Sequence, residues 1–172
     1  MQFKNVVIQS LAAAEAPIRV SSAEIGERLR PAMERLGLRP GLIEEISGIK
    51  ARRFWEEDTQ PSDAATLAAE KAINMAGIDR EKIGVLINTS VCRDYLEPST
   101  ACLVHGNLGL HERCLNFDIG NACLAFFNGM DVAARMIERG EVEYALIVDG
   151  ESSRPITEST INRLLQPEIK EE

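Results

Sequence analysis

Short apolar runs alternate with helical patterns along the second half of the chain. Residues 83–88, 115–119 and 144–149 are apolar almost throughout. Strands covered on both faces have such continuous apolar runs, so we predict three strands of one sheet. Apolar residues at helical spacing lie between them, over residues 98–108 and 122–139. Strands that alternate with helices of this length are typical of a parallel α/β sheet.

The first half of the chain carries weaker signals. Residues 6–11 predict a strand. Ser21 and Glu24 have the spacing of a capping box, and apolar residues at helical spacing follow them. Pro31 falls inside that pattern and is expected to kink or restart the helix. A further helix is predicted over residues 64–77.

A cysteine lies where such sheets bind their ligands. Ligands bind beyond the carboxyl ends of parallel strands, and the loops over residues 89–97, 120–123 and 150–152 follow those ends. Cys123 opens a helical pattern, and Asn121 before it is of a type preferred at the N-cap. If Asn121 caps that helix, free backbone N–H groups and the positive end of the helix dipole surround the sulfur, which favours a thiolate nucleophile. The alternative is a small buried apolar residue, the usual role of a free cysteine.

Composition argues against several classes of function. The chain has 172 residues, of which 45% are hydrophobic, and a net charge of −8. This charge argues against a surface for nucleic acid or anionic membranes, and no run approaches the ~18 apolar residues of a membrane span. The four cysteines form no CxxC pair and the N-terminus does not resemble a signal peptide. We therefore expect reduced thiols and a cytoplasmic location.

The predicted helix over residues 122–139 does not fit an isolated domain. It is apolar on most sides in its first half, and a helix of that kind is buried on both sides. The rest of the chain offers little to cover its second side. We therefore expect a partner layer, from another chain or from sequence not present here.

At these residues the sequence resembles the thiolase superfamily. The motif at residues 121–126 is similar to the nucleophile motif of the ketoacyl synthase III branch. Residues 87–91, 93–101 and 121–140 resemble the OleA-type enzymes of bacterial long-chain olefin biosynthesis. The resemblance implies that residues 1–172 are one α/β half-domain, the N-terminal half of a thiolase fold. Its sheet would be mostly parallel with helices on both faces, and the closing strand and the C-terminal half would be absent.

The resemblance also implies a chemistry. In that family the cysteine takes a fatty acyl group from coenzyme A as a thioester, and a second acyl-CoA, deprotonated at its α-carbon, attacks it without decarboxylation. Cys123 would be the nucleophile, and its backbone N–H would help to hold the oxyanion. Glu97 would be the base that removes the α-proton, reaching into the neighbouring subunit of a dimer. The alternative for Glu97 is a carboxylate that favours a helix N-terminus.

The sequence gives weaker support for a CoA-binding site and for a zinc site. The family's CoA-stacking pair is replaced by Leu42 and Ile46. Arg52 and Arg53 could contact CoA phosphates, but the sequence favours a solvated basic face over that role. A zinc site is not expected, because the nearby histidines and cysteines match no common ligand spacing. The CoA thioesters are substrates, so no separate cofactor is expected.

The resemblance thus implies an acyltransferase subunit or fragment that condenses two long-chain acyl-CoAs to a β-keto acid through Cys123. The family's catalytic His and Asn lie in the missing half, so the chain alone is expected to be inactive. One alternative is a decarboxylating ketoacyl synthase III-like enzyme that uses a malonyl thioester. Another is a non-catalytic half that completes a second thiolase-fold subunit.

Overall fold

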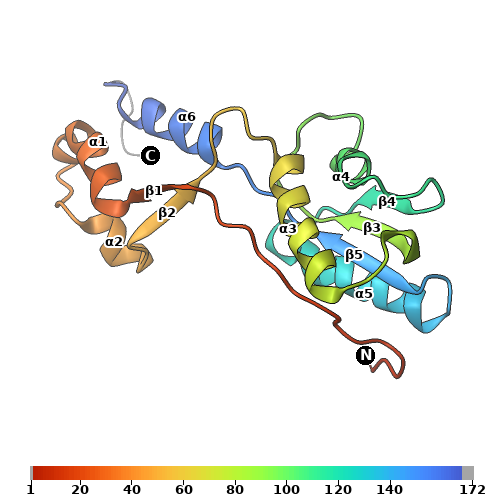
Figure 1. Cartoon of the computed structure of the whole chain (residues 1–172). Helices are drawn as coiled ribbons and strands as arrows, with labels where there is room; N and C mark the ends of the chain where they lie inside the picture. Colours follow the sequence, from red (N-terminus) through yellow and green to blue (C-terminus); the bar gives the residue numbers. More distant parts are fainter. Residues whose placement is uncertain (1, 168–172) are drawn as a thin grey trace. The chain divides into compact units, whose positions relative to one another are not determined.

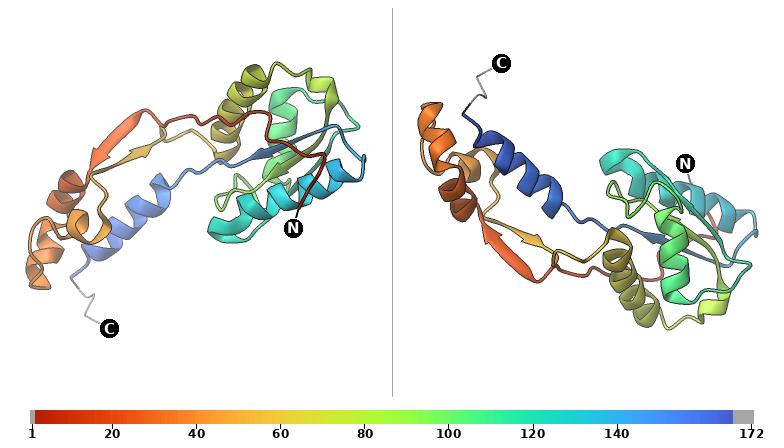
Figure 2. Two further views of the ribbon diagram at one scale, coloured as in Figure 1. Left: turned by 90° about the horizontal axis from the view of Figure 1, so that it is seen from below. Right: turned by 90° about the horizontal axis from the view of Figure 1, so that it is seen from above.

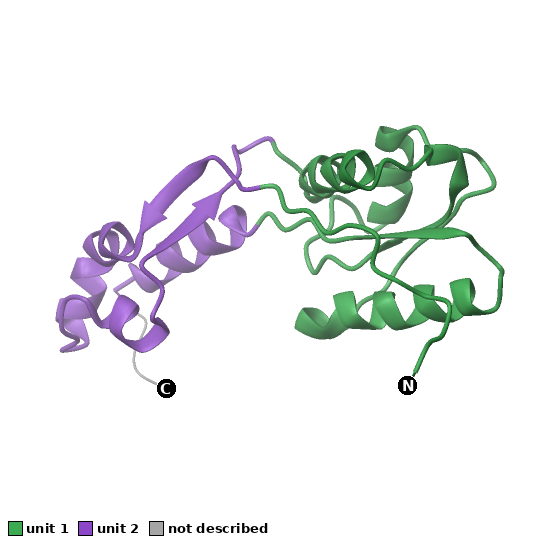
Figure 3. Cartoon of the chain, turned by 60° about the horizontal axis from the view of Figure 1, so that its bottom comes forward, with its two compact units in different colours: residues 1–14, 59–152 green, residues 15–58, 153–172 purple. Residues whose placement is uncertain are grey.

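The computed structural model describes residues 2–167 and divides the chain into two compact units. The first unit contains residues 1–14 and 59–152, and the second contains residues 15–58 and 153–172 (Figure 3). Each unit is described by itself. That residues 1–172 form one half-domain stays a prediction.

The first unit is built on a three-stranded parallel sheet with the order β4-β3-β5. The strands are β3 (Ile83–Asn88), β4 (Leu115–Asp118) and β5 (Tyr144–Val148). They confirm the three strands expected from the apolar runs, with slightly earlier ends for β4 and β5. In the central strand β3, Val85 and Ile87 have no exposed surface, as expected for a strand that is covered on both faces.

Helices cover both faces of this sheet (Figures 1 and 2), as the fold prediction required. On one face lie α3 (Pro61–Ala76) and α4 (Thr100–Leu108), and on the other lies α5 (Ala125–Glu138). Ile83 and Leu86 of β3 belong to an apolar cluster beneath α3 and α4, and Val85 and Ile87 belong to a second cluster beneath α5. Between α3 and β3 the chain makes a short 3₁₀ turn, η1 (Arg80–Lys82).

Helix α3 begins earlier than residue 64. Its N-cap is Gln60, and the Asp63 carboxylate accepts a hydrogen bond of 3.0 Å from the Gln60 backbone N–H. Pro61 occupies the first helical position, where its missing N–H leaves no hydrogen bond unmade. The helix ends at Gly77, which has φ of 63°, a conformation that glycine adopts without strain.

The strand expected over residues 6–11 is not formed, so that prediction was wrong. Within the described residues no strand pairs with this segment, and Val7, Ile8 and Leu11 are exposed. An apolar run becomes a strand only where a neighbouring strand supplies hydrogen-bond partners. The segment is instead held along α3, where the Ser10 hydroxyl donates a hydrogen bond of 2.8 Å to the carbonyl of Ala72.

The second unit combines a small antiparallel sheet with three helices. Strands β1 (Ile18–Ser21) and β2 (Ala51–Phe54) pair with each other. The helices are α1 (Ser22–Arg35), α2 (Leu42–Ser47) and α6 (Arg154–Leu164).

The start of α1 agrees with the sequence. The predicted capping box is present, since Ser21 accepts from the Glu24 backbone N–H and the Glu24 side chain accepts from the Ser21 N–H. Pro31 lies inside one continuous helix, so the helix does not restart there.

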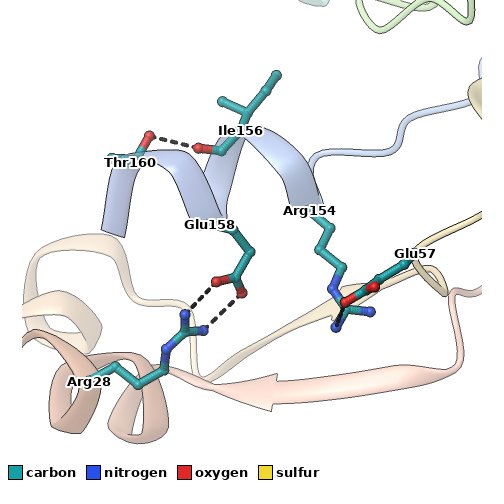
Figure 4. Close-up of polar contacts among 6 residues, drawn as sticks. All are labelled: Arg28, Glu57, Arg154, Ile156, Glu158 and Thr160. Carbon is teal, nitrogen blue, oxygen red and sulfur yellow. Dashed lines mark hydrogen bonds and ion pairs between the residues drawn. The ribbon is translucent and has the colours of Figure 1, made fainter. Parts of the chain in front are cut away.

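Polar contacts hold α6 to the rest of the second unit (Figure 4). The Glu158 carboxylate accepts hydrogen bonds from both terminal nitrogens of Arg28 of α1. Arg154 donates to the carbonyl of Trp55 at 3.3 Å. It also lies 3.4 Å from the Glu57 carboxylate. In the described part of the chain, none of the helices has the length and apolar character that crossing a bilayer requires.

Candidate active site

Three loops of the first unit follow the carboxyl ends of the parallel strands. They are residues 89–99 after β3, residues 119–121 after β4 and residues 149–152 after β5. Because parallel strands end at the same edge of a sheet, the three loops share that edge. Cys123 lies just beyond the second loop and Glu97 lies within the first.

Cys123 lies in a 3₁₀ turn, η2 (Ala122–Leu124), that leads directly into α5. The α-helix therefore starts at Ala125, later than the sequence suggested. Asn121 makes no side-chain cap, and its amide donates instead to Asn128 Oδ1 at 2.7 Å. The capping prediction for Asn121 was wrong because Ala122 turns the chain sharply, with φ of 44°, in the left-handed region that non-glycine residues rarely adopt.

The Cys123 side chain is exposed, whereas Cys114 is buried in the core beneath α4. In this structure Cys114 fills the role of a small apolar core residue, and burial raises the pKa of its thiol. The exposed Cys123 lies next to the backbone N–H groups at the start of α5. Free amide groups at a helix start are suited to holding a developing negative charge.

Glu97 is exposed and precedes Pro98 through a cis peptide bond. Within residues 2–167 its carboxylate has no hydrogen-bond or ion-pair partner. Helix α4 begins only at Thr100, and its N-cap Ser99 accepts a hydrogen bond of 3.2 Å from the Cys102 N–H. Glu97 is therefore outside the first turn of the helix.

The carboxylate that does meet the start of α4 is Asp118, from the end of β4. It accepts hydrogen bonds from the backbone N–H groups of Thr100 at 3.1 Å and Ala101 at 2.8 Å. Asp118 was not predicted as a functional residue from the sequence. An acidic residue at the end of an apolar strand could have marked this position in the sequence. Its partners, the backbone N–H groups at the start of α4, depend on the tertiary fold and could not be predicted from the sequence.

Two carboxylates tie down the loop that carries Glu97. Asp94 accepts from the Ser62 backbone N–H at 3.0 Å, at the start of α3. Glu151, after β5, accepts from the N–H groups of Val91 at 2.7 Å and Cys92 at 3.1 Å. The loop is thereby fixed at residues 91–92 and again at Asp94, and Glu97 lies three residues after Asp94.

Beneath the loops a chain of buried hydrogen bonds crosses the sheet. The Gly150 N–H donates to Ser90 Oγ at 2.7 Å, and the Ser90 hydroxyl donates to Asn88 Oδ1 at 2.7 Å. The Asn88 amide then donates to Asp118 Oδ1 at 3.2 Å. Asn88 and Ser90 are buried, so these bonds satisfy polar groups that water does not reach.

Two groups beside β5 have shifted ionisation. Partial burial, and then repulsion by the Glu151 carboxylate, raise the pKa of Asp149. Burial, followed by contact with Glu151, raises the pKa of the Cys92 thiol. Both shifts disfavour additional negative charge next to Glu151.

Arg52 and Arg53 lie on β2 of the second unit, and each has a partner there. Arg52 donates to Ser22 Oγ at 2.9 Å. Arg53 donates to the carbonyl of Ala16 at 3.1 Å and lies 3.2 Å from the Glu15 carboxylate. These contacts account for the positions of both side chains without a ligand, and a role for them in binding CoA phosphates stays a prediction.

Within residues 2–167 no three His, Cys, Asp or Glu side chains are grouped to hold a metal ion.

Comparison with known sequences gives a consistent family. Residues 117–163 match the family model for 3-oxoacyl-[acyl-carrier-protein (ACP)] synthase III. The acyl-CoA:acyl-CoA alkyltransferase of Xanthomonas campestris is 56% identical over 172 residues, which is 100% of this chain and 51% of the relative. The enzyme of the same name from Shewanella oneidensis is 39% identical over 96% of this chain and 47% of its own length. The chain thus spans about half the length of the curated relatives that it matches.

Solved structures match equally well. The crystal structure of a glutamate-to-aspartate variant of Xanthomonas campestris OleA superposes with a TM-score of 0.95 at 55% identity, covering 99% of this chain and 52% of that chain. A cysteine-to-alanine variant of OleA also matches with a TM-score of 0.95. A structure described as 3-oxoacyl-(acyl carrier protein) synthase III from Xanthomonas oryzae has a TM-score of 0.96 at 55% identity, with coverage of 99% and 50%. The chain therefore belongs to the ketoacyl synthase III branch of the thiolase superfamily and corresponds to the N-terminal half of its OleA-type members.

Proposed function

We propose that this chain supplies the acyl-accepting half of a site that condenses two long-chain acyl-CoAs. The observation that carries the proposal is the exposed Cys123 thiol in the turn that opens α5, at the ligand-binding edge of a parallel sheet. The related proteins named acyl-CoA:acyl-CoA alkyltransferase support the same substrate class.

In the first step the Cys123 sulfur attacks the carbonyl carbon of the acyl-CoA thioester. The bond from carbon to the CoA sulfur breaks, free CoA leaves with the thiol proton, and the acyl group stays on Cys123 as a thioester. The backbone N–H of Cys123 would stabilise the oxyanion that forms on the way. No separate cofactor is needed, because both substrates arrive activated as CoA thioesters.

Glu97 is our candidate for the base of the second step. It would take the α-proton of the second acyl-CoA, whose carbanion attacks the Cys123 thioester and releases the thiolate. In the solved OleA variants the altered glutamate and the altered cysteine are separated by as many residues as Glu97 and Cys123. Because Glu97 is exposed and has no partner within residues 2–167, it is free to project toward the site of a neighbouring subunit in a dimer.

Apolar side chains near both residues fit a fatty acyl substrate. Leu96 is 85% exposed and adjoins Glu97, and Phe127 is 66% exposed in the first turn of α5. Further exposed apolar side chains on the same two segments are Val91, Tyr95 and Leu124. Exposed apolar surface of this kind marks a binding site for a ligand or for a partner. The same residues are available to the missing half, so condensation by the chain alone is not expected.

The runner-up is a decarboxylating synthase that uses a malonyl thioester, and the matched synthase III family model favours it. Such an enzyme would obtain its carbanion by loss of carbon dioxide and would not need Glu97. With the C-terminal half supplied, Glu97→Gln should abolish condensation of two acyl-CoAs under our proposal and leave malonyl-dependent condensation intact under the runner-up.

The acyl transfer itself is tested on the chain as it stands. After incubation with a long-chain acyl-CoA, peptide mapping by mass spectrometry should find an acyl adduct on Cys123 that is absent in Cys123→Ser. Cys102 is also exposed, so Cys102→Ser is the matched control and should keep the adduct. If no adduct forms even with the C-terminal half present, the nucleophile assignment is wrong and a non-catalytic partner half becomes the better explanation.

A further inference from the structure

We infer that Asp118 is a positioning residue that holds the Glu97 segment and the Cys123 turn in register. The inference rests on the proposed function, in which these two residues act in one condensation. Asp118 ends β4, so it lies on the strand that leads into the Cys123 turn. Its carboxylate binds the backbone of Thr100 and Ala101, just after the Glu97 segment.

Helix α4 does not need Asp118 merely to have a cap. Ser99 already accepts a hydrogen bond from the Cys102 N–H, which is the ordinary local way to satisfy a helix start. A carboxylate from another strand does something that a local cap cannot do. It fixes the position of the start of α4 relative to β4. Because the Glu97 segment precedes α4 and the Cys123 turn follows β4, it also fixes the position of that segment relative to that turn.

Asp118 is itself held in place from the opposite side. The amide of the buried Asn88 donates to Asp118 Oδ1 at 3.2 Å, and Asn88 is oriented by the hydroxyl of Ser90, which accepts from Gly150. The carboxylate thus has three N–H donors and the positive end of a helix dipole around it. Hydrogen bonds in such a chain strengthen one another when every member is satisfied.

This hydrogen-bond network joins the ends of all three parallel strands. Gly150 follows β5, Asn88 ends β3 and Asp118 ends β4. Each of the three loops at the candidate site therefore starts at or beside a residue of the network. A disturbance at Asp118 should reach the first two loops together, whereas a simple capping residue would affect α4 alone.

The test is hydrogen–deuterium exchange of the chain with Asp118→Asn. Asparagine keeps one oxygen but places an NH₂ group against a backbone N–H, so one of the two bonds to α4 is lost. We expect exchange to become about tenfold faster both in residues 94–101 and in residues 119–124, as loss of a charge-assisted hydrogen bond predicts. Amides of β3 should keep their protection, which separates positioning from general destabilisation.

Asp131→Asn is the matched control, because it also removes one carboxylate, paired with Arg135 at 2.9 Å on the surface of α5. It should leave both segments unchanged. Faster exchange confined to the start of α4 would reduce Asp118 to a cap and overturn the inference. Equal loss of protection in β3 would do the same.

Ser90→Ala provides a milder second variant. It removes the acceptor of the Gly150 N–H and the donor to Asn88, and we expect a smaller increase in exchange in the same two segments. No change there would contradict the network. The rate of Cys123 acylation, measured in parallel, should fall several-fold in Asp118→Asn. If the wild-type chain forms no adduct at all, the proposed function fails while the exchange data still decide the positioning role.

Discussion

Gly129 of α5 lies so close to Thr89, the residue just after β3, that a Cβ atom at position 129 would be 2.9 Å from Thr89 Cγ2. The same atom would be 3.2 Å from Ile147 Cγ2 on β5. Helix α5 therefore approaches the sheet this closely only because residue 129 has no side chain. The turn that carries Cys123 precedes this contact on the same helix.

Gly129→Ala should destabilise the first unit. The added methyl group must push Thr89 or the helix aside, and such overpacking costs about 1–3 kcal/mol. Replacing a helical glycine by alanine stabilises the helix by up to ~1 kcal/mol, because alanine has the higher helix propensity. We expect a net loss of about 1 kcal/mol in the free energy of unfolding, measured by urea denaturation, and slower acylation of Cys123.

Gly106→Ala is the control, since Gly106 is also helical but nothing lies within 4 Å of the Cβ position. It should raise the free energy of unfolding by roughly 0.5–1 kcal/mol. If both variants were stabilised alike, the close approach of α5 to Thr89 would be refuted.

Ala122 is the next candidate for a local test. Its φ of 44° is left-handed, which costs a non-glycine residue roughly 1–2 kcal/mol. Ala122→Gly removes that strain but adds freedom to the unfolded chain, so we expect stability within about 1 kcal/mol of the wild type and an intact Cys123 turn. Ala122→Val, with a β-branched side chain, should lower the free energy of unfolding and slow Cys123 acylation. Equal behaviour of the two variants in urea denaturation would show that the left-handed turn is absent.

Features that depend on local periodicity could be predicted from the sequence. The apolar runs over residues 83–88 and 115–119 identified β3 and β4, because a strand buried on both faces leaves few polar positions. The capping box of Ser21 and Glu24 was found because both partners lie within one turn. The sheet edge then placed Cys123, since all parallel strands deliver their loops to one side.

Features that depend on distant partners were missed. The apolar segment around Val7 has the composition of a strand but no strand to pair with in the described residues. The start of α4 is bound by Asp118, which no local pattern connects to Thr100. Ala122 is an ordinary helix former by propensity, and only the path from β4 into α5 forces its left-handed conformation.

Asp149 should give a pH-dependent effect. Partial burial and Glu151 raise its pKa above the ordinary value of 3.8, so the folded state binds the proton more tightly than the unfolded state. Stability associated with this group is therefore present at low pH and lost as pH rises through the folded-state pKa. Asp149→Asn should raise the free energy of unfolding at pH 7 by about 0.5 kcal/mol, allowing for solvent screening, and the gain should vanish at a pH below 3.8.

The control for this effect is Asp131→Asn, which loses the pair with Arg135 and should lower stability slightly at pH 7. Urea denaturation at several pH values distinguishes the two. A stability gain for Asp149→Asn that persisted unchanged at low pH would mean that burial of its charge is not the cause.

The last prediction concerns the second unit, where Arg28 of α1 and Glu158 of α6 form a two-pronged pair (Figure 4). The hydrogen bonds of Arg28 lower the pKa of Glu158 below its ordinary value of 4.5, so the stabilisation is present above that value and lost as pH falls through the folded-state pKa. Both side chains are about 40% exposed, which limits the pair to about 0.5 kcal/mol. In a double-mutant cycle, Arg28→Gln and Glu158→Gln should each remove about that amount, and the double variant should lose little more. Arg30→Gln, whose partner Glu27 lies within α1, should show no coupling to Glu158→Gln. Strict additivity of the first cycle would show that this pair does not hold α6 against α1. A coupling unaffected by high salt would show instead that charge attraction is not its source.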